Sequence, residues 1–100
     1  MLLPMLASAA DVKINETNFP DENFRNWVLS QEYGDDGVLT NVEIAKVTRI
    51  DVSNKGIQNL KGIEYFTALK ELYCNGNQLT SLDVSKNTGL KTLICFGNPL

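Results

Sequence analysis

The sequence from Leu69 to Leu79, LKELYCNGNQL, decides the fold. It fits the pattern L-x-x-L-x-L-x-x-N-x-L, with a cysteine in one of the apolar positions. Residues 90–100, LKTLICFGNPL, fit the same pattern 21 positions later, and a looser copy starts at Val47, 22 positions earlier, with Lys55 in place of the asparagine. Segments that recur with such a period predict a fold built from stacked, similar units.

Each repeat predicts one coil of a solenoid. A short strand would place Leu72 and Cys74 on one face, and the chain would then turn and return so that the next strand lies alongside. The asparagines that follow, Asn77 and Asn98, can bind backbone groups inside the turn. We therefore predict an α/β solenoid of leucine-rich repeats with short parallel strands over residues 47–100, about two and a half coils of a truncated array.

The return half of the coil has its own pattern. Leu82 and Val84 alternate with polar residues, which predicts a second short strand. Asp83, Ser85 and Asn87 are then expected to face water.

Cys74 and Cys95 are the only cysteines. They occupy an inward position of the repeat, where a thiol acts as a small apolar side chain. A disulfide between neighbouring strands is the alternative, although side chains leaving the same face in parallel rarely reach the dihedral angle that a disulfide needs.

Residues 11–46 lack the repeat and predict a small helical N-terminal cap, similar to an EF-hand. A helix is expected to begin with Pro20 in its first turn and to end near Gln31 or Glu32. Its apolar face consists of Phe24, Trp27 and Val28. We expect Trp27 to cover the first coil, because an open end would leave apolar side chains and strand edges in water.

The segment after this helix has two interpretations. As a calcium loop that ends at Glu43, it would use the side chains of Glu32, Asp36, Thr40 and Glu43 and the carbonyl of Val38. Gly37 then occupies the sixth position, but Gly34 leaves the third position without a ligand. The alternative is a capping box, in which Thr40 and Glu43 open a short helix that runs to about Val47.

The outward side chains of the predicted strands form the candidate binding surface, here called the strand face. Its members are Arg49, Asp51, Glu71, Tyr73, Asn75, Thr92, Ile94 and Phe96. Tyr73, Ile94 and Phe96 together would make an aromatic and apolar cluster of the kind that anchors protein interfaces. Scattered surface residues, or shielding by further coils, are the alternatives.

Composition excludes several classes of function. The chain has no histidine, the side chain most used for proton transfer near neutral pH. No nucleophile and base pair and no glycine-rich phosphate loop is present, so we predict that the chain is not an enzyme and needs no cofactor, with calcium the one possibility left open. A net charge of −3, with Lys and Arg scattered singly, disfavours nucleic acid as a partner.

The first ten residues, MLLPMLASAA, form an apolar run that ends in small residues. Residues 1–10 therefore predict the remnant of a signal peptide, and an N-terminal extension without structure is the alternative. No other segment approaches the roughly 20 apolar residues that a membrane-spanning helix needs.

Three phrases carry a family resemblance: INETNFPDENFRN at 14–26, LKGIEYFTALKELYC at 60–74 and NQLTSLDVSKNT at 77–88. They resemble the secreted leucine-rich-repeat proteins of Bacteroidales-type bacteria, which are similar to BspA-like and internalin surface proteins. The resemblance implies a helical cap before many coils, further repeats after residue 100, a secreted or cell-surface bacterial location, and a role in adhesion and protein binding. The calcium-like loop of such caps is altered here at Glu32 and Gly34.

The leading hypothesis is a recognition module whose strand face binds a protein or a glycan. A calcium-stabilised structural module and a targeting appendage of a larger enzyme are the alternatives. Because at least three coils are usually needed for a stable stack, we also expect marginal stability for the chain alone.

Overall fold

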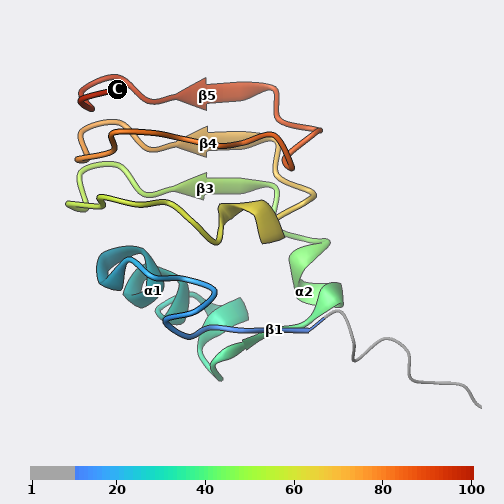
Figure 1. Ribbon diagram of the computed structural model, residues 1–100. Coiled ribbons are helices and arrows are strands. Elements are labelled where there is room, and N and C mark those ends of the chain that lie inside the picture. The colour runs from blue at the N-terminus through green and yellow to red at the C-terminus, as the bar shows by residue number, and fades with distance from the viewer. Residues whose placement is uncertain (1–10) are drawn as a thin grey trace, which may run out of the picture.

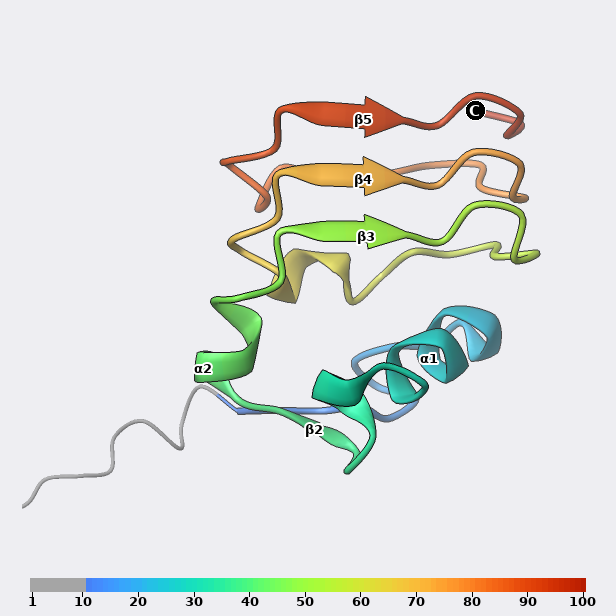
Figure 2. The same ribbon diagram turned by 180° about the vertical axis from the view of Figure 1, so that it is seen from behind.

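The computed structural model of the protein describes residues 11–100, so the predicted signal-peptide remnant at 1–10 lies outside the described residues (Figure 1). The cap contains strand β1 (Val12–Lys13), helix α1 (Glu22–Leu29), the 3-10 helix η2 (Glu32–Gly34), strand β2 (Val38–Leu39) and helix α2 (Asn41–Ile44). The repeats contain strand β3 (Arg49–Asp51), the 3-10 helix η3 (Ile63–Tyr65) and strands β4 (Glu71–Tyr73) and β5 (Thr92–Ile94). The cap covers one end of the stacked coils, as both views show (Figures 1 and 2).

The strands β3, β4 and β5 form one parallel sheet in chain order, as the repeat predicts. Ile50 pairs with Leu72, and Leu72 pairs with Leu93, so the same repeat position recurs in each coil. Ile50 and Leu72 are fully buried, whereas Leu93 on the last coil is 37% exposed. The matching segments therefore lie side by side and share one apolar interior.

The predicted role of the repeat asparagines is confirmed. Asn77 is buried, and its side-chain oxygen accepts hydrogen bonds from the N–H groups of Lys55 and Ile57, both at 3.0 Å. Its amide nitrogen donates to the carbonyl oxygens of Val52 and Cys74, both at 2.9 Å. One side chain thus joins two coils at the turn.

Asn98 repeats this arrangement one coil later. Its side-chain oxygen accepts from the N–H of Leu79 at 3.0 Å, and its amide donates to the carbonyls of Cys74 and Cys95. The two asparagines form the start of a ladder of side chains that satisfy the turn's backbone groups.

The return side of the coils differs from the prediction. No strand forms at Leu82 or Val84, which are half-buried. The preceding coil carries η3 on this side, and a 3-10 helix offers no extended backbone with which a neighbouring segment could form a sheet.

The predicted exposure of Asn87 is wrong. This side chain is 3% exposed, and its amide donates to the carbonyl oxygens of Ile63 and Phe66 in the preceding coil, both at 2.9 Å. Each of these carbonyls also accepts a backbone N–H, from Phe66 and Leu69, and Asn87 occupies the remaining acceptor position of each. The return side therefore has its own asparagine contact between coils.

Helix α1 begins after Asp21, whose Oδ1 accepts the N–H of Phe24 at 3.0 Å as an N-cap. The helix ends at Leu29, earlier than the predicted Gln31 or Glu32. The N–H of Ser30 already binds two carbonyls of the last turn, and η2 follows directly.

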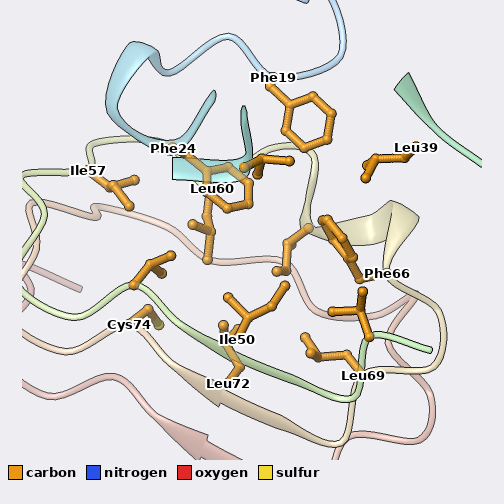
Figure 3. Close-up of a cluster of buried hydrophobic side chains, with 14 of the residues drawn as sticks. Phe19, Phe24, Leu39, Ile50, Ile57, Leu60, Phe66, Leu69, Leu72 and Cys74 are labelled. Carbon is orange, nitrogen blue, oxygen red and sulfur yellow. The ribbon is translucent and has the colours of Figure 1, made fainter. Parts of the chain in front are cut away.

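Phenylalanines, rather than Trp27, make the central contacts between the cap and the first coil. Phe19 and Phe24 are fully buried, whereas Trp27 is half-buried and its ring stacks on Phe24 at 6.4 Å between centroids. Figure 3 shows the two phenylalanine rings in one cluster with Leu60 and Phe66 of the first coil. Trp27 packs against the edge of this cluster, so the expectation that it covers the coil was only partly correct.

Polar contacts hold the cap in the same place. The second carboxylate oxygen of Asp21 accepts the N–H groups of Gln58 and Asn59 at 2.8 and 3.2 Å. The side-chain amide of Asn23 donates to the carbonyl of Gly56 at 3.1 Å. Asp21 therefore caps its own helix and binds the first coil at once.

Helix α2 has the predicted capping box. The Thr40 hydroxyl accepts the N–H of Glu43 at 3.1 Å, and the Glu43 carboxylate accepts the N–H of Thr40 at 2.8 Å. The helix ends at Ile44, short of the predicted Val47. The antiparallel pair of β1 and β2 was not predicted, because two-residue strands leave no readable alternation in a sequence.

Both cysteines are free thiols. Cys74 is fully buried, as expected for a small apolar side chain, and Cys95 is half-buried. Burial, with a smaller contribution from Cys95, raises the pKa of Cys74 to about 11.

Candidate interaction surface

The sheet sets the eight residues of the strand face in rows across the coils. Arg49, Glu71 and Thr92 are in register in one row, and Asp51, Tyr73 and Ile94 form the next. Asn75 and Phe96 follow at the ends of β4 and β5, where the N–H of Gly76 donates to the carbonyl of Phe96 at 2.9 Å. Figure 2 shows the three strands stacked side by side. Residues from different repeats are therefore brought together on one surface.

Arg49 is the centre of a polar cluster on the strand face. Its guanidinium lies 4.8 Å from the centre of the Tyr73 ring and 3.8 Å from carboxylate oxygens of both Asp51 and Glu71. The Tyr73 hydroxyl donates to Glu71 at 3.0 Å. These contacts restrain four side chains of two coils before any partner arrives.

Asp51 is kept ionised by its neighbour Ser53. The hydroxyl and the N–H of Ser53 donate to one Asp51 oxygen at 2.7 and 3.0 Å, and these bonds, together with the charges of Arg49 and Lys55, lower the pKa of the Asp51 carboxyl. The other oxygen is the one that faces Arg49. The strand face thus carries two carboxylates against one guanidinium.

The apolar part of the strand face lies on the last two coils. Phe96 is 71% exposed, and Ile94 and Tyr73 are half-buried neighbours in the sheet. The structure places all three on the side predicted from their alternation. Their use in binding stays a prediction.

A pocket at the junction of cap and repeats could not be found from the sequence. It has a volume of about 480 Å³ and is lined by Glu32, Tyr33, Glu43, Lys46, Val47, Thr48 and Arg49. We call it the cap pocket. It adjoins the strand face, because Arg49 belongs to both. The calcium-loop pattern singled out Glu32 and Glu43, but no pattern indicated that Tyr33 would lie near Val47 and Arg49.

The predicted calcium ligands are partly occupied with one another. Thr40 and Glu43 bind each other's backbone in the capping box, and Asp36 accepts the N–H of Val38 at 3.1 Å. Glu32 lies in η2 and shares the cap pocket with Glu43. Within residues 11–100, no group of three or more acidic, cysteine or histidine side chains gathers as a metal site. Calcium binding stays a prediction.

No known protein-family profile matches the chain. Internalin J of Listeria monocytogenes serotype 4b (strain F2365) is 37% identical to it over 71 residues, which cover 70% of this chain and 8% of that protein. A solved structure of the functional domain of InlJ from Listeria monocytogenes, described as including a cysteine ladder, superimposes with a TM-score of 0.74 at 32% identity over 88% of this chain. The chain is an internalin-like leucine-rich-repeat protein.

Two further internalin structures of Listeria monocytogenes resemble this internalin-like protein. InlF gives a TM-score of 0.71 at 30% identity over 94% of the chain, and internalin C2 gives 0.76 at 24% identity over 98%, which shows the fold alone. The predicted leucine-rich-repeat solenoid is thereby confirmed, whereas the narrower kinship with Bacteroidales-type proteins stays a prediction. Cys74 and Cys95 occupy one position in successive coils of this internalin-like protein.

The internalin-like chain spans 8% of the length of Internalin J and 20%, 28% and 43% of the three solved chains. Among the residues that the structure describes, no helix is long and apolar enough to cross a bilayer.

Proposed function

We propose that this chain is a protein-recognition module of a secreted or cell-surface bacterial protein, and that the strand face binds the partner. The observation that carries the proposal is the ordered cluster of Arg49, Asp51, Glu71 and Tyr73 beside the exposed ring of Phe96. The similarity to internalins supports a module of this kind.

Preorganisation makes this cluster suitable for binding. Ordering a long side chain at an interface costs about 0.5–1.5 kcal/mol, and this cost is reduced for side chains that are already held in place. Arg49 and Tyr73 are so held, and both belong to residue types that dominate interface energies. Phe96, two residues beyond Ile94, the strand partner of Tyr73, supplies an exposed apolar anchor on the same face.

The binding test uses the fluorescently labelled chain on whole cells, with and without prior removal of surface proteins by a protease or of surface glycans by glycosidases. Protease treatment should abolish binding, and glycosidases should leave it intact. Loss after glycosidase treatment alone would instead make the partner a glycan.

Variants assign the binding to the strand face. Tyr73→Ala and Phe96→Ala should each weaken binding about tenfold or more, because each removes an aromatic contact. Thr88→Ala, an exposed substitution on the return side, is the matched control and should leave binding unchanged. Equal binding by all three variants would contradict the proposal.

A further inference from the structure

We propose that the cap pocket binds a lysine or arginine side chain of the protein partner that lies across the strand face. The inference rests on the proposed function and makes it more specific, since it gives the partner's chemistry at one defined place. Four properties of the pocket support it: its walls, its charges, its size and its position.

The walls suit the aliphatic stem of a long basic side chain. Tyr33 is half-buried, and its ring meets Phe66 edge to face at 6.1 Å between centroids, which fixes the ring's orientation. Val47 is 6% exposed and adds an aliphatic surface. Burial raises the pKa of Tyr33 from its ordinary value of 10.0 to about 12, and a phenol with either value is neutral at physiological pH. A neutral aromatic ring and an aliphatic side chain are the surfaces along which lysine and arginine stems pack.

The charges of the pocket favour a cation. Its lining contains Glu32 and Glu43 against Lys46 and Arg49. Arg49 lies 3.8 Å from a carboxylate oxygen of both Asp51 and Glu71 on the strand face, so part of its charge is balanced outside the pocket. Neither Glu32 nor Glu43 takes part in an ion pair within residues 11–100, which leaves two carboxylates against the exposed Lys46.

One of these carboxylates is held in place by the fold. The N–H of Thr40 donates to Oε1 of Glu43 at 2.8 Å, a neutral donor that orients the group without cancelling its charge. A guanidinium or ammonium group that reaches Glu43 therefore meets an anion that needs no further ordering.

Size and position complete the case. The cap pocket is open to solvent, and its volume of about 480 Å³ leaves room for one long side chain to lie in it. Arg49 belongs to both the cap pocket and the polar cluster of the strand face. A partner bound to the strand face can therefore also place a side chain in the pocket. Basic side chains are a feature of proteins, which agrees with a protein partner.

The experiment titrates the ¹⁵N-labelled chain with Nα-acetyl-arginine amide and follows backbone amide shifts. Shifts are expected at residues 32–33 and 46–49, with millimolar affinity, because a single side chain supplies little binding area. The isosteric neutral Nα-acetyl-citrulline amide should bind at least fivefold more weakly. Equal shifts with both compounds, or shifts confined to other regions, would overturn the proposal.

Charge-removing variants complete the experiment. Glu32→Gln and Glu43→Gln should each weaken arginine-amide binding at least threefold, and glutamine at position 43 keeps the capping box, so α2 is preserved. Glu16→Gln, an exposed site outside the pocket, is the control for net charge and should bind as the parent does. Unchanged affinity in both pocket variants would reject the proposal.

The strand-face variant Phe96→Ala separates this inference from the proposed function, because Phe96 is not part of the cap pocket. It should weaken cell binding and still bind arginine amide as the parent chain does. Cell binding without arginine-amide binding would leave the recognition function standing and reject the basic side chain as the occupant of the cap pocket.

Discussion

Asn77 shows how much of the fold depends on one side chain. We predict that Asn77→Ala destabilises the chain by about 3 kcal/mol, because the buried N–H of Ile57 and the part-buried N–H of Lys55 lose their acceptor and the carbonyls of Val52 and Cys74 each lose a donor. Urea unfolding followed by circular dichroism measures the change. Asn75→Ala, two residues earlier on the half-exposed strand face, is the control and should cost less than about 0.5 kcal/mol. Similar losses for both would contradict the role given to Asn77.

Cys74 and Cys95 should differ in reactivity although they occupy the same repeat position. Iodoacetamide reacts with the thiolate, and with a pKa of about 11 only about a thousandth of Cys74 is thiolate at pH 8. Alkylation followed by peptide mass spectrometry should find Cys95 modified first in the native chain, and Cys74 only as the pH rises toward 11. Because the unfolded chain gives up this proton near its ordinary pKa of 9.0 and the folded chain keeps it, stability is unaffected below about pH 9 and falls as the pH rises from there to about 11. Equal rates at pH 8 would refute the prediction.

At the scale of elements, the segment that opens α2 tests capping against calcium. We predict that Glu43→Ala costs about 1 kcal/mol in the free energy of unfolding and that Glu43→Gln costs almost nothing, because glutamine can also accept the N–H of Thr40. Thermal melts in calcium and in a chelator supply the comparison. Equal melting midpoints in both solutions agree with a capping box alone. A higher midpoint in calcium than in chelator, if Glu43→Gln removes the difference, would instead establish the calcium loop.

Repeats were easier to predict than the elements between them. The spacing of Leu72 and Leu93 was sufficient to predict the stacked parallel strands, because similar segments have similar neighbours in successive coils. The return side could not be predicted in the same way, because one coil carries η3 there and the next has neither helix nor strand. Asn87 was misplaced for that reason: its partners are carbonyls of a helix that alternation does not reveal.

The candidate site was predictable only where it follows the repeat. The alternation of apolar and polar residues was sufficient to place Tyr73 and Phe96 outward. The repeat aligns the strands, but it does not indicate which outward side chains touch, so the contact between Arg49 and Tyr73 could not be predicted. Glu32 and Val47 line the same pocket although they are far apart in the sequence, and no local sequence pattern indicates that they lie close together.

At the scale of the whole molecule, the cap and the coils share one core and should unfold together. Trp27, the single tryptophan, reports on the cap, whereas circular dichroism also reports on the sheet. We predict coincident urea transitions for tryptophan fluorescence and circular dichroism, because Phe24 of the cap is fully buried among residues of the first coil. Phe24→Ala should lower the urea midpoints of both signals equally, which corresponds to a loss of about 3–4 kcal/mol in the free energy of unfolding. Val42→Ala, at a 61% exposed site on α2, should lower neither. If Phe24→Ala lowers the fluorescence midpoint and leaves the circular dichroism midpoint unchanged, the coils fold without the cap. Burial of the phenylalanine rings would then not couple the unfolding of the cap to that of the coils.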